Sequence, residues 1–356
     1  MFSFAFASVL IAFVVTAGAI PLYRSFLQRS ASHDRDEEVL KPVPKVAGAG
    51  MLFGVFMALF YLDSSPGSAT ELLVAGVFLV LVGSWLGRPG AEHSNHGWVF
   101  GYELGASAII GLGLMLAMSL GPIHWSLGSI VLLAMAMMTP AAISLLSRSP
   151  LATPALPAGI ALIQLLLLAL LGALGAHDME ELAQYKDFRI IALPTIGALI
   201  GALIYLCRMP WRTEAEVSTG VVTRLCLGLV VTWGAVGLGI GPGADNERTA
   251  ALSWILAAPV FELLRRYAVA ALTGIFPDDG VARDRYAAAN AGHSPASIGI
   301  FALMLGGIGI VLWHLQVPGV WSVLALAPAF MVYSIAPLLL PSLASSHPSS
   351  MVDAQS

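Results

Sequence analysis

The feature that most constrains this chain is a succession of apolar segments, each long enough to cross a membrane. A hydrocarbon core is about 30 Å thick, and a helix needs about 20 apolar residues to span it. Because lipid offers no hydrogen bonds to the backbone, these runs predict an all-α, polytopic integral membrane protein. The eleven expected spans are 2–22, 46–62, 71–87, 99–120, 122–140, 155–176, 189–207, 220–241, 250–272, 297–316 and 319–341.

The composition excludes a soluble globular protein. Of the 356 residues, 58% are hydrophobic and 11% are charged, and the mean hydropathy is +0.84. We expect residues 1–341 to form a single polytopic membrane domain and 342–356, which are rich in serine, to form a disordered cytoplasmic tail. The two cysteines, Cys207 and Cys226, fall in or near expected spans, which favours buried apolar residues over a disulfide framework or a thiolate metal site.

The distribution of basic residues predicts the orientation. No positive residue precedes the first apolar run, and Arg24 and Arg29 follow it, so we interpret this run as a retained span with its N-terminus outside. Of the 17 lysines and arginines, all but Lys186, Arg189 and Arg248 then lie on the cytoplasmic side. This asymmetry agrees with the positive-inside rule, and eleven spans place the C-terminus in the cytoplasm.

Five segments, mostly at the expected cytoplasmic ends of spans, have distinctive sequences. They are Pro44–Gly48 (Pro-Lys-Val-Ala-Gly), Leu79–Arg88, Leu225–Gly228, Pro259–Glu262 (Pro-Val-Phe-Glu) and Ala291–His293. Together with the span count and orientation, they resemble framework elements of the polyprenyl-phosphate N-acetylhexosamine-1-phosphate transferases. That superfamily includes the phospho-N-acetylmuramoyl-pentapeptide translocases and the undecaprenyl-phosphate GlcNAc-1-phosphate transferases. The resemblance extends over nearly the whole chain.

The resemblance implies a reaction and a place in the cell. In that superfamily a lipid phosphate attacks the β-phosphate of a UDP-sugar, Mg²⁺ is held by aspartates of the cytoplasmic loops, and UMP leaves. The implied setting is polysaccharide biosynthesis for the cell envelope, at the bacterial inner membrane. The implied partners are membrane lipid, including polyprenyl phosphate, and other glycan-assembly membrane proteins; no nucleic acid is expected.

The positions at which that superfamily carries its catalytic residues differ in this chain. Leu86 and Gly87 stand where the superfamily has paired aspartates, and neither side chain can bind a metal ion. Residues 144–151 contain no carboxylate where it has an Asn-x-x-Asp-Gly-x-Asp-Gly motif, and 220–224 contain none where it has Gly-Asp-x-Gly-Ser. Arg283–Tyr286 replaces its histidine motif. These differences predict that the chain lacks the transferase's metal site.

Several carboxylates remain near the expected inner face. Glu214, Glu216 and Asp279 are weak catalytic candidates, which would hold Mg²⁺ only if the transferase activity were retained through replacement ligands. The alternative is that they are solvated loop charges. No metal site and no cofactor is assigned. Glu262 lies inside an expected span, and its spacing from Arg266 suits an ion pair within one helix.

The basic residues near the expected phosphate pocket are the other candidates. Arginine binds phosphate through paired hydrogen bonds without needing a metal ion. The alternative is that these residues only set the topology and attract anionic lipid. The candidate phosphate-binding residues are Lys45, Arg212, Arg224, Arg283 and Arg285.

Three hypotheses for function follow. The first is a catalytically inactive homologue that binds a lipid phosphate or another anion, or that acts as a scaffold for glycan-assembly enzymes. The second is an active transferase that uses replacement carboxylates. The third is a transporter, suggested by the 36 glycines and 21 prolines. The first is favoured, because a likeness of framework is no basis for chemistry when the reacting residues differ.

Overall fold

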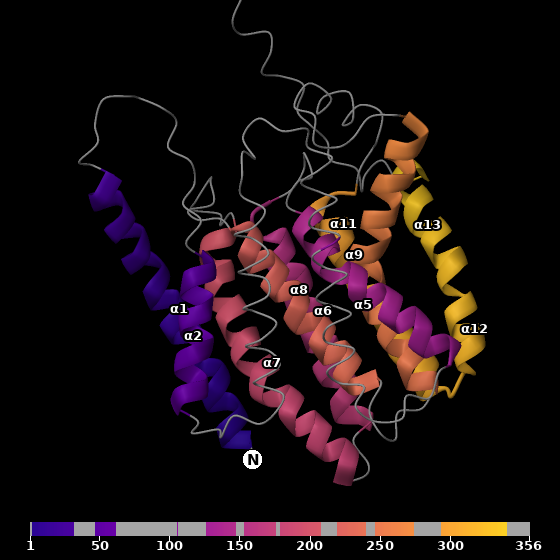
Figure 1. Cartoon of the computed structure of the whole chain (residues 1–356), viewed down its shortest axis with the longest axis horizontal. Helices are drawn as coiled ribbons and strands as arrows, with labels where there is room; N and C mark the ends of the chain where they lie inside the picture. The colour runs from indigo at the N-terminus through magenta and orange to yellow at the C-terminus, as the bar shows by residue number, and fades with distance from the viewer. Residues whose placement is uncertain are drawn as a thin grey trace, which may run out of the picture.

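The computed structural model describes residues 2–31, 47–61, 105, 126–146, 153–175, 179–207, 219–239, 246–273 and 293–339. Every element in these ranges is an α-helix, as expected of an all-α protein. The helices are α1 (Phe2–Ala31), α2 (Ala47–Tyr61), α5 (Leu127–Leu146), α6 (Leu156–Gly175), α7 (Met179–Leu206), α8 (Val221–Gly239), α9 (Asn246–Thr273), α11 (Pro295–His314), α12 (Gly319–Leu324) and α13 (Leu326–Leu339). They run between the two ends of a bundle, and α12 and α13 follow one another in the same direction (Figure 1).

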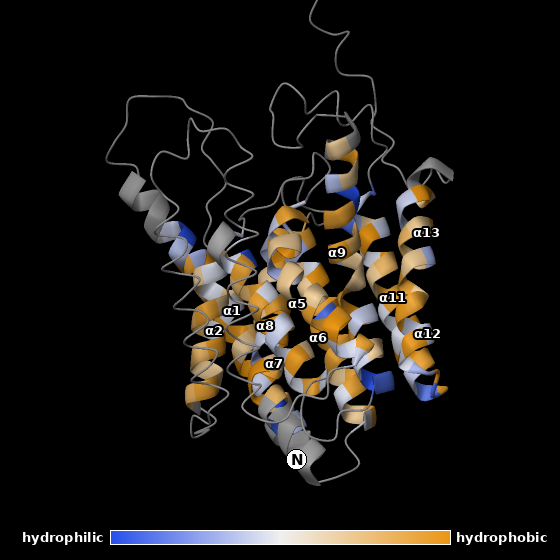
Figure 2. Ribbon diagram, turned by 45° about the vertical axis from the view of Figure 1, so that its right-hand side comes forward, coloured by the Kyte–Doolittle hydropathy of each residue, from blue (hydrophilic) through white to orange (hydrophobic). Residues whose placement is uncertain are grey.

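Six of the described segments are long and apolar enough to cross a membrane. They are Phe6–Ser25, Leu127–Leu146, Leu156–Gly175, Phe188–Leu206, Pro295–His314 and Gly319–Ala336. Two further apolar helices, Ala47–Phe60 and Thr223–Gly239, are shorter. Hydrophobic residues cover the length of the bundle, and hydrophilic residues gather toward its ends (Figure 2). These features support a membrane protein. The count of eleven spans stays a prediction, because 71–87 and all of 99–120 except residue 105 lie outside the described residues.

The helix α9 is the most enclosed element and also carries several charges. It packs against α5, α6, α8, α11, α12 and α13. Every residue from Arg248 to Leu263 is buried. A helix that contacts protein on all sides can hold charged groups at membrane depth, because neighbouring helices rather than lipid surround them.

Four of the helices or spans differ in their boundaries from those expected. The fifth expected span was 122–140, whereas α5 continues through Pro140 to Leu146, so 141–146 are helix rather than loop. The segment 177–188, expected to be an external loop, is largely the beginning of α7. Residues such as Met, Glu, Leu, Ala and Gln favour helix, so the helix extends beyond the apolar run that defined the span. The helix α1 likewise continues to Ala31. The last expected span, 319–341, is divided at Ala325 into α12 and α13.

Hydrogen bonds from neighbouring helices explain why three helices continue past an internal proline. A proline has no N–H, so the carbonyl four residues before it loses its intrahelical donor. In α5 that carbonyl is Ala136 O, four residues before Pro140, and Thr232 Oγ1 of α8 donates to it at 3.0 Å.

The same arrangement occurs in α1 and α9. Tyr205 Oη of α7 donates at 2.8 Å to Ala17 O, four residues before Pro21. Gln164 Nε2 of α6 donates at 3.2 Å to Ile255 O, four residues before Pro259. In each case a neighbouring helix supplies the missing hydrogen bond, which keeps the proline-containing helix intact in a medium that supplies none.

Small residues bring α1 close to its two neighbours. A Cβ at Gly197 or Gly201 of α7 would overlap the backbone of α1, at Val9 O and Phe13 O respectively. On the other side of α1, a Cβ at Gly54 of α2 would overlap Thr16 Oγ1. Glycines spaced in this way let membrane helices approach until their backbones touch, and they explain why α1 packs tightly between α2 and α7.

Candidate functional site

The starts of α2 and α8 meet at the upper end of the bundle in Figure 1. A Cβ added to Gly48 of α2 would overlap the hydroxyl of Thr223 in the first turn of α8. This contact joins two segments singled out by their sequences, the Pro44–Gly48 element and the 220–224 segment that lacks the expected aspartate. Glycine at position 48 is therefore required by the close approach of the two helices.

Arg224 is the one candidate phosphate-binding residue that lies within the described ranges. It is partly buried in the first turn of α8. Its Nη1 donates at 3.0 Å to Thr219 O, just before the helix begins. The guanidinium group thus folds back toward the N-terminal end of α8, near the start of α2.

The other candidates lie outside the described residues. They are the basic residues Lys45, Arg212, Arg283 and Arg285 and the carboxylates Glu214, Glu216 and Asp279. Their roles stay predictions.

The other polar constellation is a buried cluster centred on Glu262 of α9. Its Oε1 accepts from Arg265 Nη2 at 2.8 Å and from Arg266 Nε at 2.8 Å. Its Oε2 accepts from Arg265 Nε at 3.1 Å and from Tyr333 Oη of α13 at 3.0 Å. A carboxylate offers about four acceptor positions, and all of them are used here. The ion pair expected between Glu262 and Arg266 is confirmed, and Arg265 extends it.

The cluster connects four helices. Arg266 Nη1 donates at 3.1 Å to Leu145 O, near the C-terminal end of α5. Tyr333 is completely buried, and its ring packs edge-to-face against Phe261 of α9 at 5.9 Å between centroids. These contacts connect α5, α9 and α13 through polar groups that are buried inside the protein.

His293, just before α11, extends the cluster to a fourth helix. Its Nε2 lies 2.8 Å from Tyr333 O, and because a carbonyl oxygen only accepts, this nitrogen carries a proton. Its Nδ1 lies 3.4 Å from Ser297 Oγ in the first turn of α11. Its ring also lies against that of Tyr333, at 4.2 Å between centroids.

Burial lowers the pKa of His293, and the nearby Glu262 offsets part of that effect. The neutral imidazole is therefore favoured in the folded protein, with one nitrogen donating and the other able to accept.

The described residues do not fit a magnesium site. Mg²⁺ prefers carboxylate oxygens with room for several water ligands. Glu262 would have to lose hydrogen bonds to two arginines and a tyrosine before it could bind a metal ion. Within the part of the chain that the structure describes, no three His, Cys, Asp or Glu side chains are grouped so as to hold one.

Of the segment 144–151, which was expected to take the place of a catalytic motif, the structure describes 144–146, and these residues belong to a packed helix. Ser144, Leu145 and Leu146 are buried at the end of α5. The carbonyl of Leu145 is a structural acceptor for Arg266, as described above.

Sequence reasoning found part of this cluster and missed the rest. Glu262 and Arg266 were found because they lie four residues apart on one helix. Arg265 had a weaker signal of the same kind, at a spacing of three residues. Tyr333 had none, because it lies 71 residues from Glu262 within an apolar run.

No protein-family model matches the chain, and no curated protein matches it at a significant level.

Proposed function

We propose that this protein is a membrane protein with the framework of a sugar-1-phosphate transferase but without its chemistry, and that it binds a lipid phosphate at its cytoplasmic face. The proposal starts from the resemblance of its framework segments to the polyprenyl-phosphate transferases. It departs from them at the residues that would hold the metal ion.

The observation that carries the proposal is the environment of Glu262. It is an intramembrane carboxylate in a segment that resembles the superfamily's Pro-x-x-Asp helix. All of its acceptor positions are taken by Arg265, Arg266 and Tyr333. Phosphoryl transfer brings several negative charges together, and catalysis consists largely of positioning them and neutralising their charge. A carboxylate committed to a structural cluster does not contribute to that task.

A second observation supports the same proposal. Of residues 144–151, compared above with the superfamily's Asp-rich second motif, the described residues 144–146 are the buried end of α5, and Leu145 O accepts from Arg266. A packing contact thus occupies a position that a catalytic loop would need.

The proposed ligand follows from the basic residues. Arg212, Arg224, Arg283 and Arg285, with Lys45, are expected on one side of the membrane. Guanidinium groups bind phosphate oxygens through paired hydrogen bonds and need no metal ion for this. A lipid phosphate reaches such groups from within the membrane, with its chain in the hydrocarbon and its charge at the surface.

A transferase assay tests the absence of chemistry. Purified protein is incubated with radiolabelled UDP-N-acetylglucosamine, Mg²⁺ and undecaprenyl phosphate, and UMP release is measured. We expect release no faster than in a protein-free control. Turnover well above that control would overturn the proposal. If that turnover were lost on changing Glu214, Glu216 or Asp279 to alanine, a rewired transferase would replace it.

A binding measurement tests the ligand. Native mass spectrometry of the protein with undecaprenyl phosphate should show a bound lipid that the corresponding uncharged alcohol does not compete away. The double variant Arg283→Gln/Arg285→Gln should weaken this binding at least about tenfold, because each charge-assisted hydrogen bond contributes about 1.5–3 kcal/mol. The matched control is Arg189→Gln, on the predicted outer side. Equal binding by both variants would contradict the ligand assignment.

A further inference from the structure

The last helix, α13, lies at the edge of the bundle (Figure 1). Within the part of the chain that the structure describes, it packs against α9 and α12. Its buried side chains there are Leu326, Tyr333 and Ala336, whereas Met331 and Val332 are more than half exposed. Tyr333 is completely buried, so the position of this edge helix depends strongly on that one residue.

Tyr333 connects α13 to its neighbours through both ends of the residue. Its hydroxyl donates to Glu262 of α9 at 3.0 Å, and its carbonyl oxygen accepts from His293 Nε2, just before α11, at 2.8 Å. Its ring also packs edge-to-face against Phe301 of α11, at 4.9 Å between centroids. One of the two polar contacts that hold α13 is therefore made by an imidazole, which gains and loses a proton near neutral pH.

The beginning of α13 adjoins a break in the helix at Ala325. On the other side of this break α12 is fixed to α9, because Trp254 Nε1 donates to Ser322 O at 3.0 Å. This arrangement lets α13 pivot about Ala325 while α12 stays in place.

The residue after Tyr333 lowers the cost of such a movement. Ser334 Oγ is buried and has no hydrogen-bond partner among the described residues. It lies near the end of the candidate span Gly319–Ala336, where water and lipid headgroups are close. A buried hydroxyl without a partner is unfavourable, and a shift of α13 away from the bundle would let Ser334 form a hydrogen bond.

The surroundings of His293 disfavour its charged form. The charged and titratable groups near it are Glu262, Arg265 and Arg266 of α9 and Tyr333 of α13, and the first turn of α11 adds no charge. Burial lowers the pKa of His293, Glu262 offsets part of this effect, and the two arginines lower the pKa further. Protons therefore favour an arrangement in which the imidazole has left this site and reaches water.

We propose that His293 and Tyr333 form a pH-dependent anchor for α13, in which protonation of His293 breaks its contact with Tyr333 and lets α13 pivot about Ala325 away from α9 and α11. The neutral imidazole holds the helix in the arrangement described here. The inference goes beyond the proposed function and does not rest on it, because neither residue is among those proposed to bind a lipid phosphate.

Distance measurements between spin labels test the anchor. In the full-length protein Cys207 and Cys226 are replaced by serine, and nitroxides are attached to Ile300→Cys on α11 and Val332→Cys on α13, two exposed positions. In lipid nanodiscs at about pH 7.5 we expect one distance, and a second, longer distance should appear reversibly between about pH 6.5 and pH 5. An unchanged distance over this range would overturn the proposal.

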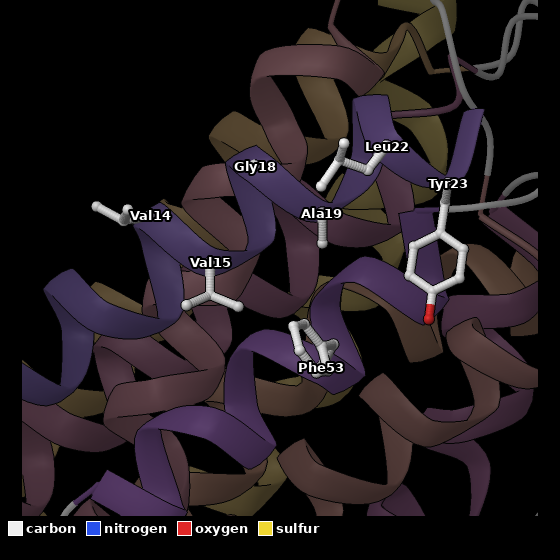
Figure 3. A pocket seen from close by; sticks show the side chains of 7 residues that line it. All are labelled: Val14, Val15, Gly18, Ala19, Leu22, Tyr23 and Phe53. Atoms are coloured by element: carbon white, nitrogen blue, oxygen red, sulfur yellow. The ribbon is translucent and has the colours of Figure 1, made fainter. Parts of the chain in front are cut away.

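The helices α1 and α2 provide the control. Between them lies an apolar groove whose described lining residues, among them Val15, Ala19 and Phe53, include no histidine and no carboxylate (Figure 3). Labels at Leu10→Cys on α1 and Phe56→Cys on α2 should keep one distance throughout. A change in both label pairs would show general loss of structure rather than movement of α13, and would overturn the proposal.

Two variants assign the effect to the anchor. His293→Gln keeps an N–H that can donate to Tyr333 O but takes up no proton, so the second distance should not appear. Its persistence in this variant would overturn the role of His293. Tyr333→Phe removes the hydrogen bond to Glu262, so the second distance should appear at a higher pH than in the wild type. An unchanged midpoint would show that the two contacts of Tyr333 do not act together, which the proposal requires.

Discussion

Glu262 shows how one buried side chain can hold several helices together. Removing one partner of a buried ion pair leaves the other charge uncompensated, which typically costs about 3–5 kcal/mol. Glu262→Gln would leave both Arg265 and Arg266 without a carboxylate to accept their hydrogen bonds. The main effect of the cluster is therefore on the stability of the folded protein.

We expect Glu262→Gln to lower the free energy of unfolding by about 3 kcal/mol, for the reason just given. Tyr333→Phe, which keeps the ring and removes one hydrogen bond, should cost about 1.5 kcal/mol. Both are measured as shifts in thermal unfolding of the purified protein. Glu247→Gln, the same chemical change at the start of α9, is the control and should have little effect. Wild-type stability of both test variants would contradict the structural role of the cluster.

The burial of His293 predicts that the stability of the protein depends on pH. Its pKa is lowered by burial, so the unfolded chain binds a proton more readily than the folded one. Above the ordinary histidine pKa of about 6.5, His293 is neutral in both the folded and the unfolded protein, so it does not change the free energy of unfolding. As the pH decreases from about 6.5 toward the lower pKa of the folded protein, the free energy of unfolding decreases. The melting temperature should therefore decrease between about pH 6.5 and pH 5. His293→Gln should reduce this dependence; an identical pH profile in the two proteins would exclude His293 as its source.

At the scale of helices, the prolines of α1, α5 and α9 are supported by side chains of other helices. Thr232, Tyr205 and Gln164 each donate to a carbonyl that a proline has deprived of its donor. These polar residues lie in apolar surroundings, where a single interhelical hydrogen bond contributes about 0.6–1.7 kcal/mol. They explain how α1, α5 and α9 continue beyond their prolines.

A double-mutant cycle tests this pairing. Gln164→Leu should lower the free energy of unfolding by about 1 kcal/mol, because Ile255 O loses its donor. In a Pro259→Ala background the same change should cost less, since the N–H of residue 259 then reaches Ile255 O. The control is Thr195→Val, whose hydroxyl donates to Ile191 O, a carbonyl already within reach of the N–H of Thr195. Equal costs of Gln164→Leu in the two backgrounds would contradict the pairing.

At the scale of the whole molecule, the arrangement of helix ends agrees with the expected loops. The C-terminal ends of α1, α5, α7 and α9 and the N-terminal ends of α2, α6, α8 and α11 lie at one end of the bundle (Figure 1). The expected cytoplasmic loops connect these ends. Which end faces the cytoplasm stays a prediction from the positive-inside rule.

Cysteine labelling tests that orientation. In the described structure Cys207 and Cys226 are free, so both are first replaced by serine. In right-side-out vesicles a membrane-impermeant maleimide should label Gly243→Cys, in a predicted outer loop, and should label Ser218→Cys, in a predicted inner loop, only after detergent is added. The reverse pattern would show that the orientation is inverted.

Much of the fold could be predicted from the sequence, because the relevant signals are local. Nine of the spans that were predicted from hydropathy and length coincide with described helices. The spacing of charges along one helix predicted the ion pair between Glu262 and Arg266. The expected end of the fifth span, at residue 140, was wrong, because the helix continues through Pro140 to Leu146. The donor that lets the helix continue, Thr232, lies 96 residues from its acceptor.

The sequence by itself determined that this chain is helical and apolar enough for a membrane, and that it lacks carboxylates at the positions where the transferases that it resembles hold a metal ion. Only the tertiary structure decided which distant groups meet: Tyr333 with Glu262, Gln164 with Ile255 O, and Gly48 with Thr223. The physical reason is that a membrane helix is apolar on most of its faces. Its rotation and register are therefore set by a few small or polar residues, and their partners become known only when the helices are packed together.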